Sequence, residues 1–254
     1  LTIESGGIVN ADNRVLTVNG KFIIDGTYTS KNSAAKDLQF NGDTLAGIGS
    51  IIVDFAGNDV VFNSTSPVTI LPSSNLTIYG NVNIQNNVTI INEGQIEVTL
   101  DIIGQNATGS VWTNDDDSYL TVGGALLEVG ILNAQAPGNT VRYNKIGDQD
   151  IKIPSAEYHN LLVSGAGTKN LLGSLVVNGN LENNNSATLN SNSYDIELMG
   201  NWKNLSSFTE GTGEVTFSGT GNQTITNPSS ETFYDFTINK ATGSIVLINN
   251  VIIS

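Results

Sequence analysis

The acidic run Asp115-Asp116-Asp117 is the densest group of carboxylates in this chain. Paired carboxylates serve as acid and base in glycoside hydrolysis, and carboxylates in a loop bind calcium. Consecutive residues of a strand point to opposite faces, so these three side chains converge only within a loop. Basic partners are scarce, because Arg14 and Arg142 are the only arginines. The run therefore predicts a solvated turn, and calcium binding or catalysis is the alternative reading.

The single histidine and the two tryptophans have side chains suited to catalysis or to ligand stacking. His159 aligns with Tyr234 in a long repeat of the chain, so its position requires a ring of some kind and not specifically an imidazole. Acid–base or metal chemistry needs partner residues, and none is recognisable around it in the sequence. Trp112 and Trp202 are able to stack on a sugar ring, but Trp202 aligns with Leu126, which predicts packing in a core.

Glycine-rich segments at 211–213 and 219–221 share only their composition with phosphate-binding loops. They do not join a strand to a helix, so they are predicted to be turns. The sequence thus predicts no catalytic residue, no cofactor-binding residue and no metal ligand. It also predicts that the chain is not an enzyme.

The composition limits the partners of the chain. Charged residues make up 13% of its 254 residues, about half the usual share, whereas Asn (34 residues) and Gly (27 residues) are abundant. The formal net charge of −14 disfavours binding to nucleic acid and to anionic membrane surfaces. The lack of Cys excludes disulfides and thiolate metal sites.

The chain shows no pattern of a membrane span or of a leader. No stretch is apolar over the length that a transmembrane helix requires, which predicts no membrane insertion. Residues 1–4 have a strand pattern without the basic head and apolar body of a signal peptide. Residues 250–254 also lie within a strand pattern. The chain is therefore expected to be a segment of a longer one.

A short period of about 22 residues runs through the first third of the chain and indicates stacked strands. Its members are the segments 16–20, 38–42, 60–63 and 82–85. In each, two apolar residues separated by one position lie on one face of a strand. Asn19, Asn41 and Asn63 follow at the same place. Because Asn tolerates the left-handed region, they are predicted to be stacked corner residues with positive φ.

Strand patterns crowd together between residues 65 and 104. The pattern of 68–70 returns at 88–90, and that of 76–78 returns at 96–98, each about 20 residues later. Several strands in each turn of about 19–22 residues are typical of a parallel β-helix, and parallel crossovers favour the right-handed form. Stacked Asn, Thr and Ser can form ladders on the outside, where stacked like charges would repel. Roughly twelve turns are expected.

A longer repeat of about 74–76 residues fills the second half of the chain. The segments 141–143, 149–151, 159–163 and 175–177 return at 215–217, 223–225, 234–238 and 251–253. Four turns of about 19 residues would account for one copy. The sequence predicts an all-β, right-handed parallel β-helix with an N-terminal section at 1–113 and a C-terminal section at 114–254 that holds both copies. Tandem antiparallel sandwiches are the alternative architecture.

The second copy, with GNWKN at 200–204, FTEGTGEVTF at 208–217 and TFYDFTINK at 232–240, carries a family resemblance. It resembles the β-helical repeat of very large surface and secreted proteins of Bacteroidetes, which are similar to adhesins that include gliding-motility adhesins. The resemblance covers residues 119–254 and, more loosely, 1–104. It implies export by the type IX secretion system and a location on the bacterial cell surface or outside the cell. Asp43-Thr44-Leu45 also resembles the O-glycosylation signal of that phylum.

These features predict a structural or adhesive repeat segment, a stalk or fibre of a large bacterial surface or secreted protein with a role in attachment or gliding. The expected partners are the rest of the longer chain, the cell-surface or secretion machinery and extracellular glycans. No cofactor is expected. The alternative is an enzyme that acts on polysaccharides or a carbohydrate-binding module, because many pectin-degrading enzymes are parallel β-helices.

Overall fold

The structure, a computed structural model, describes residues 1–12, 14–30, 37–53 and 58–254. These residues form strands, turns and bends without any helix, so none of them belongs to a helix that could cross a membrane. Two compact units, Leu1–Asn133 (unit 1) and Ala134–Ser254 (unit 2), are parallel β-solenoids. Together they contain about 11 turns, and stacked coils lie about 21 residues apart. The predicted fold class is confirmed, and its antiparallel alternative is excluded.

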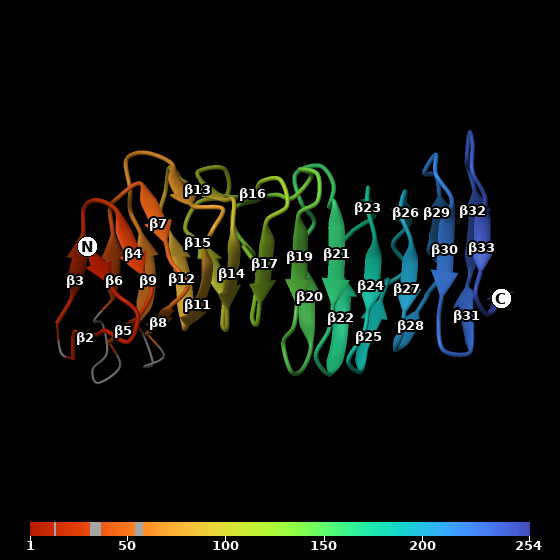
Figure 1. The fold of residues 1–254 in the computed structure, drawn as a ribbon. Coiled ribbons are helices and arrows are strands. Elements are labelled where there is room, and N and C mark those ends of the chain that lie inside the picture. Colours follow the sequence, from red (N-terminus) through yellow and green to blue (C-terminus); the bar gives the residue numbers. More distant parts are fainter. Residues whose placement is uncertain (13, 31–36, 54–57) are drawn as a thin grey trace. The chain divides into compact units, whose positions relative to one another are not determined.

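Unit 1 has three walls of parallel strands that lie side by side (Figure 1). The first wall contains β1 (Thr2–Ile3), β4 (Phe22–Ile24), β7 (Thr44–Ala46), β10 (Val68–Ile70), β13 (Val88–Asn92), β16 (Ser110–Asn114) and β18 (Ile131–Asn133). The second contains β2 (Ile8–Asn10), β5 (Thr27–Thr29), β8 (Ser50–Ile52), β11 (Asn75–Tyr79), β14 (Gln95–Val98) and β17 (Tyr119–Val122). The third contains β3 (Leu16–Val18), β6 (Leu38–Phe40), β9 (Asp59–Phe62), β12 (Asn81–Ile84) and β15 (Ile102–Gly104). The section boundary predicted between 113 and 114 falls inside β16.

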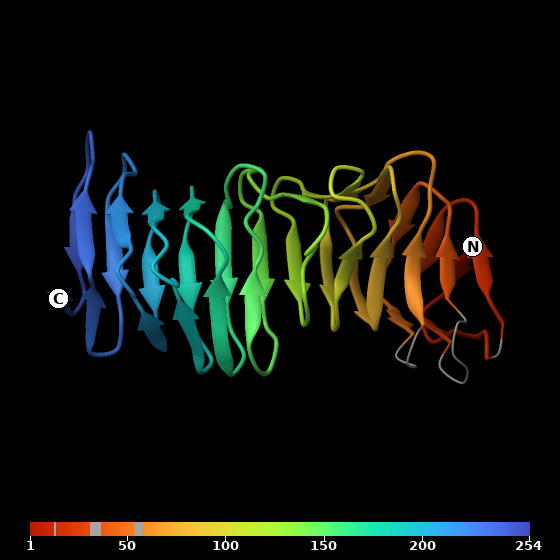
Figure 2. The same cartoon turned by 180° about the vertical axis from the view of Figure 1, so that it is seen from behind.

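Unit 2 also winds through three walls (Figure 2). The first wall contains β19 (Thr140–Tyr143), β21 (Asn160–Val163), β24 (Leu181–Asn183), β27 (Trp202–Asn204), β30 (Gln223–Thr226) and β33 (Ile245–Leu247). The second contains β20 (Gln149–Ile151), β22 (Gly167–Leu171), β25 (Ala187–Asn190) and β28 (Ser207–Thr209), followed by the separate pair β31 (Ser230–Phe233) and β34 (Asn250–Ile253). The third contains β23 (Leu175–Val177), β26 (Ile196–Leu198), β29 (Glu214–Phe217) and β32 (Asp235–Ile238).

Apolar side chains stack in columns inside each unit. Leu16, Leu38 and Val60 are register partners in the third wall of unit 1, and the column continues through Val82 and Ile102. All of these except the half-buried Leu16 are buried. Each buried aliphatic side chain stabilises the fold by about 1.5–3 kcal/mol relative to an exposed one. The predicted column and the predicted alternation of inward and outward residues are therefore confirmed.

One predicted offset in the first wall is wrong by two residues. Val68 lies beside Ile90 rather than beside Val88. In the second wall Leu76 lies beside Ile96, as predicted. A shift by two residues keeps the same face of a strand inward, so the apolar pattern alone does not distinguish the two registers.

The long repeat does not correspond to a whole number of turns. β19 and β29 carry equivalent segments of the two copies, yet they lie in the first and the third wall of unit 2. β20 and β30 differ in the same way, since they lie in the second and the first wall. With coils about 21 residues apart, one copy spans between three and four turns, and the predicted four turns of about 19 residues are wrong. Equivalent segments fit different walls because every wall requires the same alternation of inward apolar and outward polar side chains.

Asn19, Asn41 and Asn63 are not left-handed corner residues. Asn41 Nδ2 donates a hydrogen bond of 2.9 Å to Asn19 Oδ1, so the predicted stacking of these two is present. None of the three has a positive φ, however. The reason is that the backbone N–H groups of Asn41 and Asn63 still donate to the preceding turn, at Val18 O and Phe40 O, as strand residues do. The prediction of positive φ at these residues is wrong.

Asn and Asp side chains instead link successive turns. In unit 2, Asn160 Oδ1 accepts the backbone N–H of Asn180, and Asn180 Oδ1 accepts that of Asn201, each at 2.9 Å. Asn201 Oδ1 accepts the N–H of Thr224 at 2.8 Å. In unit 1, Asp37 Oδ1 accepts the N–H of Asp59 at 3.0 Å. An Asn side-chain oxygen at each turn accepts these bonds without the repulsion that closely stacked carboxylates would cause. This accounts for the many Asn residues.

A comparison of two Asn→Val variants tests this account. Asn87 has a φ of 64°, so Asn87→Val is expected to destabilise unit 1 by about 1–2 kcal/mol, because a β-branched residue is strained there. Asn41→Val removes one solvent-exposed amide bond and a buried amide oxygen that has no partner, so it should cost less, about 0.5 kcal/mol. Urea unfolding followed by circular dichroism measures both values. Equal losses would contradict the assignment.

Candidate functional site

The Asp115–Asp117 run lies in the turn between β16 and β17. Asp116 and Asp117 are exposed, and Asp117 has a φ of 55°. Asp115 Oδ1 accepts the N–H of Asp116 at 2.9 Å, and the Asp115 carbonyl accepts the Ser118 hydroxyl at 2.7 Å. In the described part of the chain no group of three or more His, Cys, Asp or Glu side chains is arranged to hold a metal ion. The run has the surface turn that the sequence predicts.

Of the ring-bearing residues singled out in the sequence, the two tryptophans pack in the core, whereas His159 is half-buried and Tyr234 is exposed. Trp112 and Trp202 are fully buried. His159 and Tyr234 each occupy a bend that directly precedes a strand, β21 and β32, which is consistent with their alignment. His159 takes part in the winding through its backbone, because its carbonyl accepts the N–H of Gly179 at 2.7 Å.

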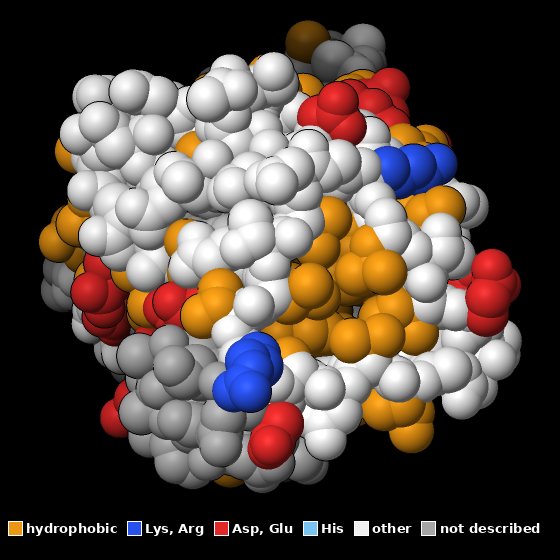
Figure 3. Space-filling view, turned by 90° about the vertical axis from the view of Figure 1, so that its left-hand side faces the viewer, with side chains coloured by type: hydrophobic (Ala, Val, Ile, Leu, Met, Phe, Trp, Pro, Cys, Tyr) orange, Lys and Arg blue, Asp and Glu red, His pale blue; other side chains and the backbone are white. Residues whose placement is uncertain are grey.

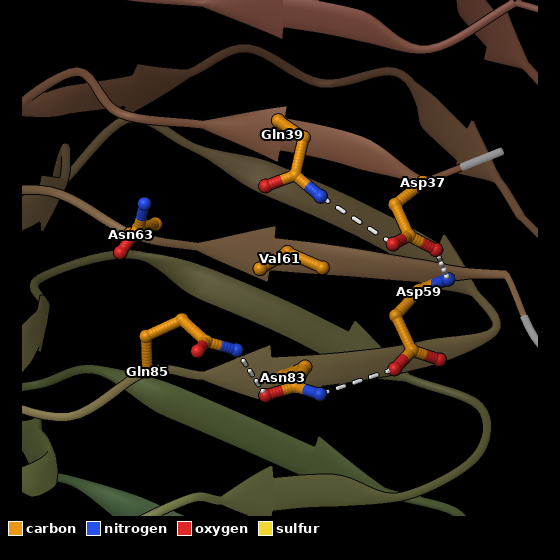
Figure 4. A pocket seen from close by; sticks show the side chains of 7 residues that line it. All are labelled: Asp37, Gln39, Asp59, Val61, Asn63, Asn83 and Gln85. Carbon is orange, nitrogen blue, oxygen red and sulfur yellow. Dashed lines mark hydrogen bonds between the residues drawn. The ribbon is translucent and has the colours of Figure 1, made fainter. Parts of the chain in front are cut away.

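A shallow groove of about 300 Å³ lies on the outward face of the third wall of unit 1 (Figure 4). Its polar side chains bind one another: Asp59 N–H donates to Asp37, Asn83 Nδ2 donates to Asp59 Oδ2 at 3.3 Å, and Gln85 Nε2 donates to Asn83 Oδ1 at 3.0 Å. Both carboxylates therefore accept hydrogen bonds from the chain itself. The groove is a ladder of carboxylates and amides across three adjacent turns.

Unit 2 encloses a buried ammonium group that the sequence pattern does not reveal. Lys169 of β22 is fully buried, and its Nζ donates to the carbonyls of Lys145 and Gly147, each at 2.8 Å, and of Ala166 at 3.3 Å. Burial lowers the pKa of Lys169, and the nearby Asp148 opposes that shift. Three carbonyl acceptors in one corner make this Lys a structural link between turns.

The second wall of unit 2 opens between β28 and β31. β28 is the last strand of its sheet, and β31 pairs only with β34. In the first and third walls, β27 pairs with β30 and β29 pairs with β32. A cavity of about 260 Å³ lies at this opening, which we call the cleft. Its wall includes Phe208, Glu210, Asn227, Ser229, Ser230 and Glu231.

Glu231 is a buried carboxylate at the base of the cleft, with an exposed fraction of 3%. It continues a buried column of amides, because Asn183 Nδ2 donates to Asn204 Oδ1 at 2.8 Å and Asn204 Nδ2 donates to Glu231 Oε1 at 3.1 Å. Trp202 Nε1 donates to Glu231 Oε2 at 2.7 Å. Burial raises the pKa of Glu231, these donors oppose the rise, and the charge of Glu210 adds to it.

The raised pKa of Glu231 predicts a pH-dependent stability. The stabilisation that the protonated Glu231 side chain gives to the fold is fully present below its ordinary pKa of 4.5. It is lost as the pH rises through the folded-state pKa, because the carboxyl group then ionises in a buried site. The stability of the wild type relative to Glu231→Gln should therefore be greater at pH 4 than at pH 7, as measured by urea unfolding. Glu197→Gln, on the outward side of β26, is the control for the change of charge. A difference that does not change with pH, or that grows towards pH 7, would argue against this role.

Asn227 lines the cleft and carries a buried side-chain amide that is unpaired. It is 4% exposed, and neither its Oδ1 nor its Nδ2 has a hydrogen-bond partner. Its backbone carbonyl, in contrast, accepts a bond from Asn249 Nδ2. Buried amides are normally paired, because an unpaired buried polar group costs about 1–3 kcal/mol.

The cleft and the groove differ in what they offer to a ligand. In the groove the carboxylates of Asp37 and Asp59 and the amides of Asn83 and Gln85 are hydrogen-bonded within the chain, whereas in the cleft the buried amide of Asn227 has no partner for its donor or its acceptor. The sequence gives one signal for the cleft, since Glu231 takes a place in a column otherwise formed by Asn.

Comparison of the chain with family models, with curated proteins and with solved structures found no match.

Proposed function

We propose that this chain is a structural and adhesive segment of a large bacterial surface or secreted protein, in which it forms part of a stalk or fibre. Its place is outside the cell, and the resemblance of residues 119–254 to Bacteroidetes surface repeats suggests export by the type IX route. The partners would be the rest of the longer chain and extracellular glycans.

The observation that carries this proposal is the linkage of each turn to the next by side chains as well as by the backbone. The series from Asn160 through Asn180 and Asn201 to Thr224 crosses several turns of unit 2 with bonds of 2.8–2.9 Å. The column that includes Leu161, Leu181 and Trp202 runs beside it inside the unit. Repeats that contact only their neighbours form extended elements whose length grows with each added turn, as a stalk requires.

Exposed apolar side chains on the first and last turns support the proposal that further protein stacks there. Leu1, Ile8 and Val15 are about half exposed or more, at 51%, 71% and 49%. Figure 3 shows hydrophobic side chains gathered on this side of unit 1. In the last turn of unit 2, Leu247 and Ile252 are 51% and 49% exposed. A neighbouring turn would bury such side chains in the way that inner turns are buried.

Force spectroscopy on the full chain, held between two reference domains, tests the stalk role. Because each turn contacts its neighbours, extension should proceed in steps of about one turn, and one turn of about 21 residues releases about 70 Å. Asn180→Ala should lower the force of at least one step, since it removes the link to Asn201. Asn239→Ala, at an exposed site, is the control. A chain that extends at forces too low to detect would refute the proposal.

A role in polysaccharide cleavage is the second candidate, because the groove of unit 1 places Asp37 and Asp59 on adjacent turns. Incubation with neutral and acidic polysaccharides, with and without calcium, tests it through the release of reducing ends. The structural proposal expects no release. Release that disappears in Asp59→Asn would establish the enzymatic role instead.

A further inference from the structure

The cleft in unit 2 is framed by paired strands in the two other walls, so it is an opening within the solenoid and not its end. The first and third walls pair β27 with β30 and β29 with β32 on either side of it. Phe208 packs against Trp202 at a ring-centroid distance of 4.9 Å and against Phe233 at 6.0 Å, which holds the base of the opening. The cavity of about 260 Å³ is somewhat smaller than the sites of drug-sized ligands.

The chemistry of the lining narrows the class of ligand. No Lys or Arg lines the cleft, and Glu210 and Glu231 do, so an anion is disfavoured. A purely apolar ligand would leave the serine hydroxyls and both polar atoms of Asn227 unpaired. A bare cation could bind Asn227 Oδ1 but would leave its Nδ2 without an acceptor. A hydroxyl group is both donor and acceptor, so a pair of hydroxyls satisfies both atoms of the amide.

We propose that the cleft between β28 and β31 binds one residue of a neutral saccharide, with Asn227 as the amide that pairs with its hydroxyls. Glu210 and the hydroxyls of Ser229 and Ser230 accept or donate further hydrogen bonds, and the half-buried ring of Phe208 provides an apolar surface for the face of the sugar ring. Glu231 keeps Trp202 and Asn204 in place beneath the site. This inference rests on the proposed adhesive role, because it names the class of ligand that the adhesive segment binds.

Titration of the full chain with methyl glycosides of glucose, galactose, mannose and N-acetylglucosamine tests the proposal. Backbone amide signals of 205–210 and 227–232 should shift in a saturable way with at least one of them, with a dissociation constant of about 1–10 mM, because a single small ligand makes few contacts. Calcium chloride and a methyl glucuronide are titrated separately. No saturable shift with any neutral glycoside would overturn the proposal, as would shifts produced by calcium chloride alone or a preference for the glucuronide.

The variant Asn227→Ala distinguishes a ligand group from a structural one. Since Oδ1 and Nδ2 have no partner within the protein, Asn227→Ala should leave the stability of the free chain unchanged or raise it, while it weakens glycoside binding at least tenfold. Asn239→Ala, at an exposed position directly after β32, should change neither property. Loss of stability in Asn227→Ala, or unchanged binding, would overturn the proposal. Neither result would alter the force measurement that tests the stalk role.

Discussion

Replacing Trp112 by alanine should lower the free energy of unfolding by about 3–5 kcal/mol, which would be among the largest effects of any single substitution in unit 1. Trp112 is fully buried and lies between Ile90 and Leu132 in the first wall. Its Nε1 also donates to Asn114 Oδ1 at 2.9 Å. The loss combines an unfilled cavity in the column with an amide oxygen that loses one of its donors. Urea unfolding followed by far-UV circular dichroism measures it.

Two further variants separate the sources of that effect. Trp112→Phe keeps an aromatic ring in the column but removes the bond to Asn114, so it should cost less, about 1–3 kcal/mol. Val111→Ala, at the neighbouring half-buried outward position, should change the stability by less than about 1 kcal/mol. If Trp112→Ala were tolerated as well as Val111→Ala, the packing role of this tryptophan would be wrong.

Replacing Gly219 by alanine should destabilise unit 2 by about 3 kcal/mol, because successive turns approach each other too closely there for a side chain. A Cβ atom at this position would lie 1.9 Å from the carbonyl oxygen of Met199 in the preceding turn. Main-chain atoms cannot rotate away as a flexible side chain does, so the two turns would have to separate. Thermal and urea unfolding of the full chain provide the measurement.

Gly221 provides a matched control two residues further along the same turn. A Cβ atom at Gly221 would meet no atom within 4 Å. Gly221→Ala should therefore be neutral or should stabilise unit 2 by about 0.4–1 kcal/mol, through a smaller entropy of the unfolded chain. A loss of stability in Gly221→Ala as large as in Gly219→Ala would show that close approach between turns is not the cause.

Much of the solenoid can be predicted from the sequence because its rules are local. The alternation at 16–18, 38–40 and 60–62 fixes which side chains point inward, and the spacing of about 22 residues brings them into one column. The choice between registers two residues apart is not local. Val68 pairs with Ile90 because of how the turns between them pack, and the alternation is the same in either register.

The cleft illustrates what local patterns leave out. Asn183, Asn204 and Glu231 form one column, but Glu231 lies 27 residues beyond Asn204, whereas Asn204 lies 21 beyond Asn183. The longer interval at this point is visible in the chain, yet its consequence is not. Only the arrangement of β28 and β31 in separate sheets shows that the interval opens a wall and leaves the amide of Asn227 unpaired.

The sequence by itself determined the stacked parallel architecture, the inward columns and the low charge that lets Asn side chains link one turn to the next. These properties depend on alternation and period, which each segment carries within itself. The tertiary structure alone decided that Asn19, Asn41 and Asn63 have no positive φ, that equivalent repeat segments lie in different walls, and where the cleft opens. These depend on how many residues each turn uses to close, which is set by packing between segments about 21 residues apart rather than within any one of them.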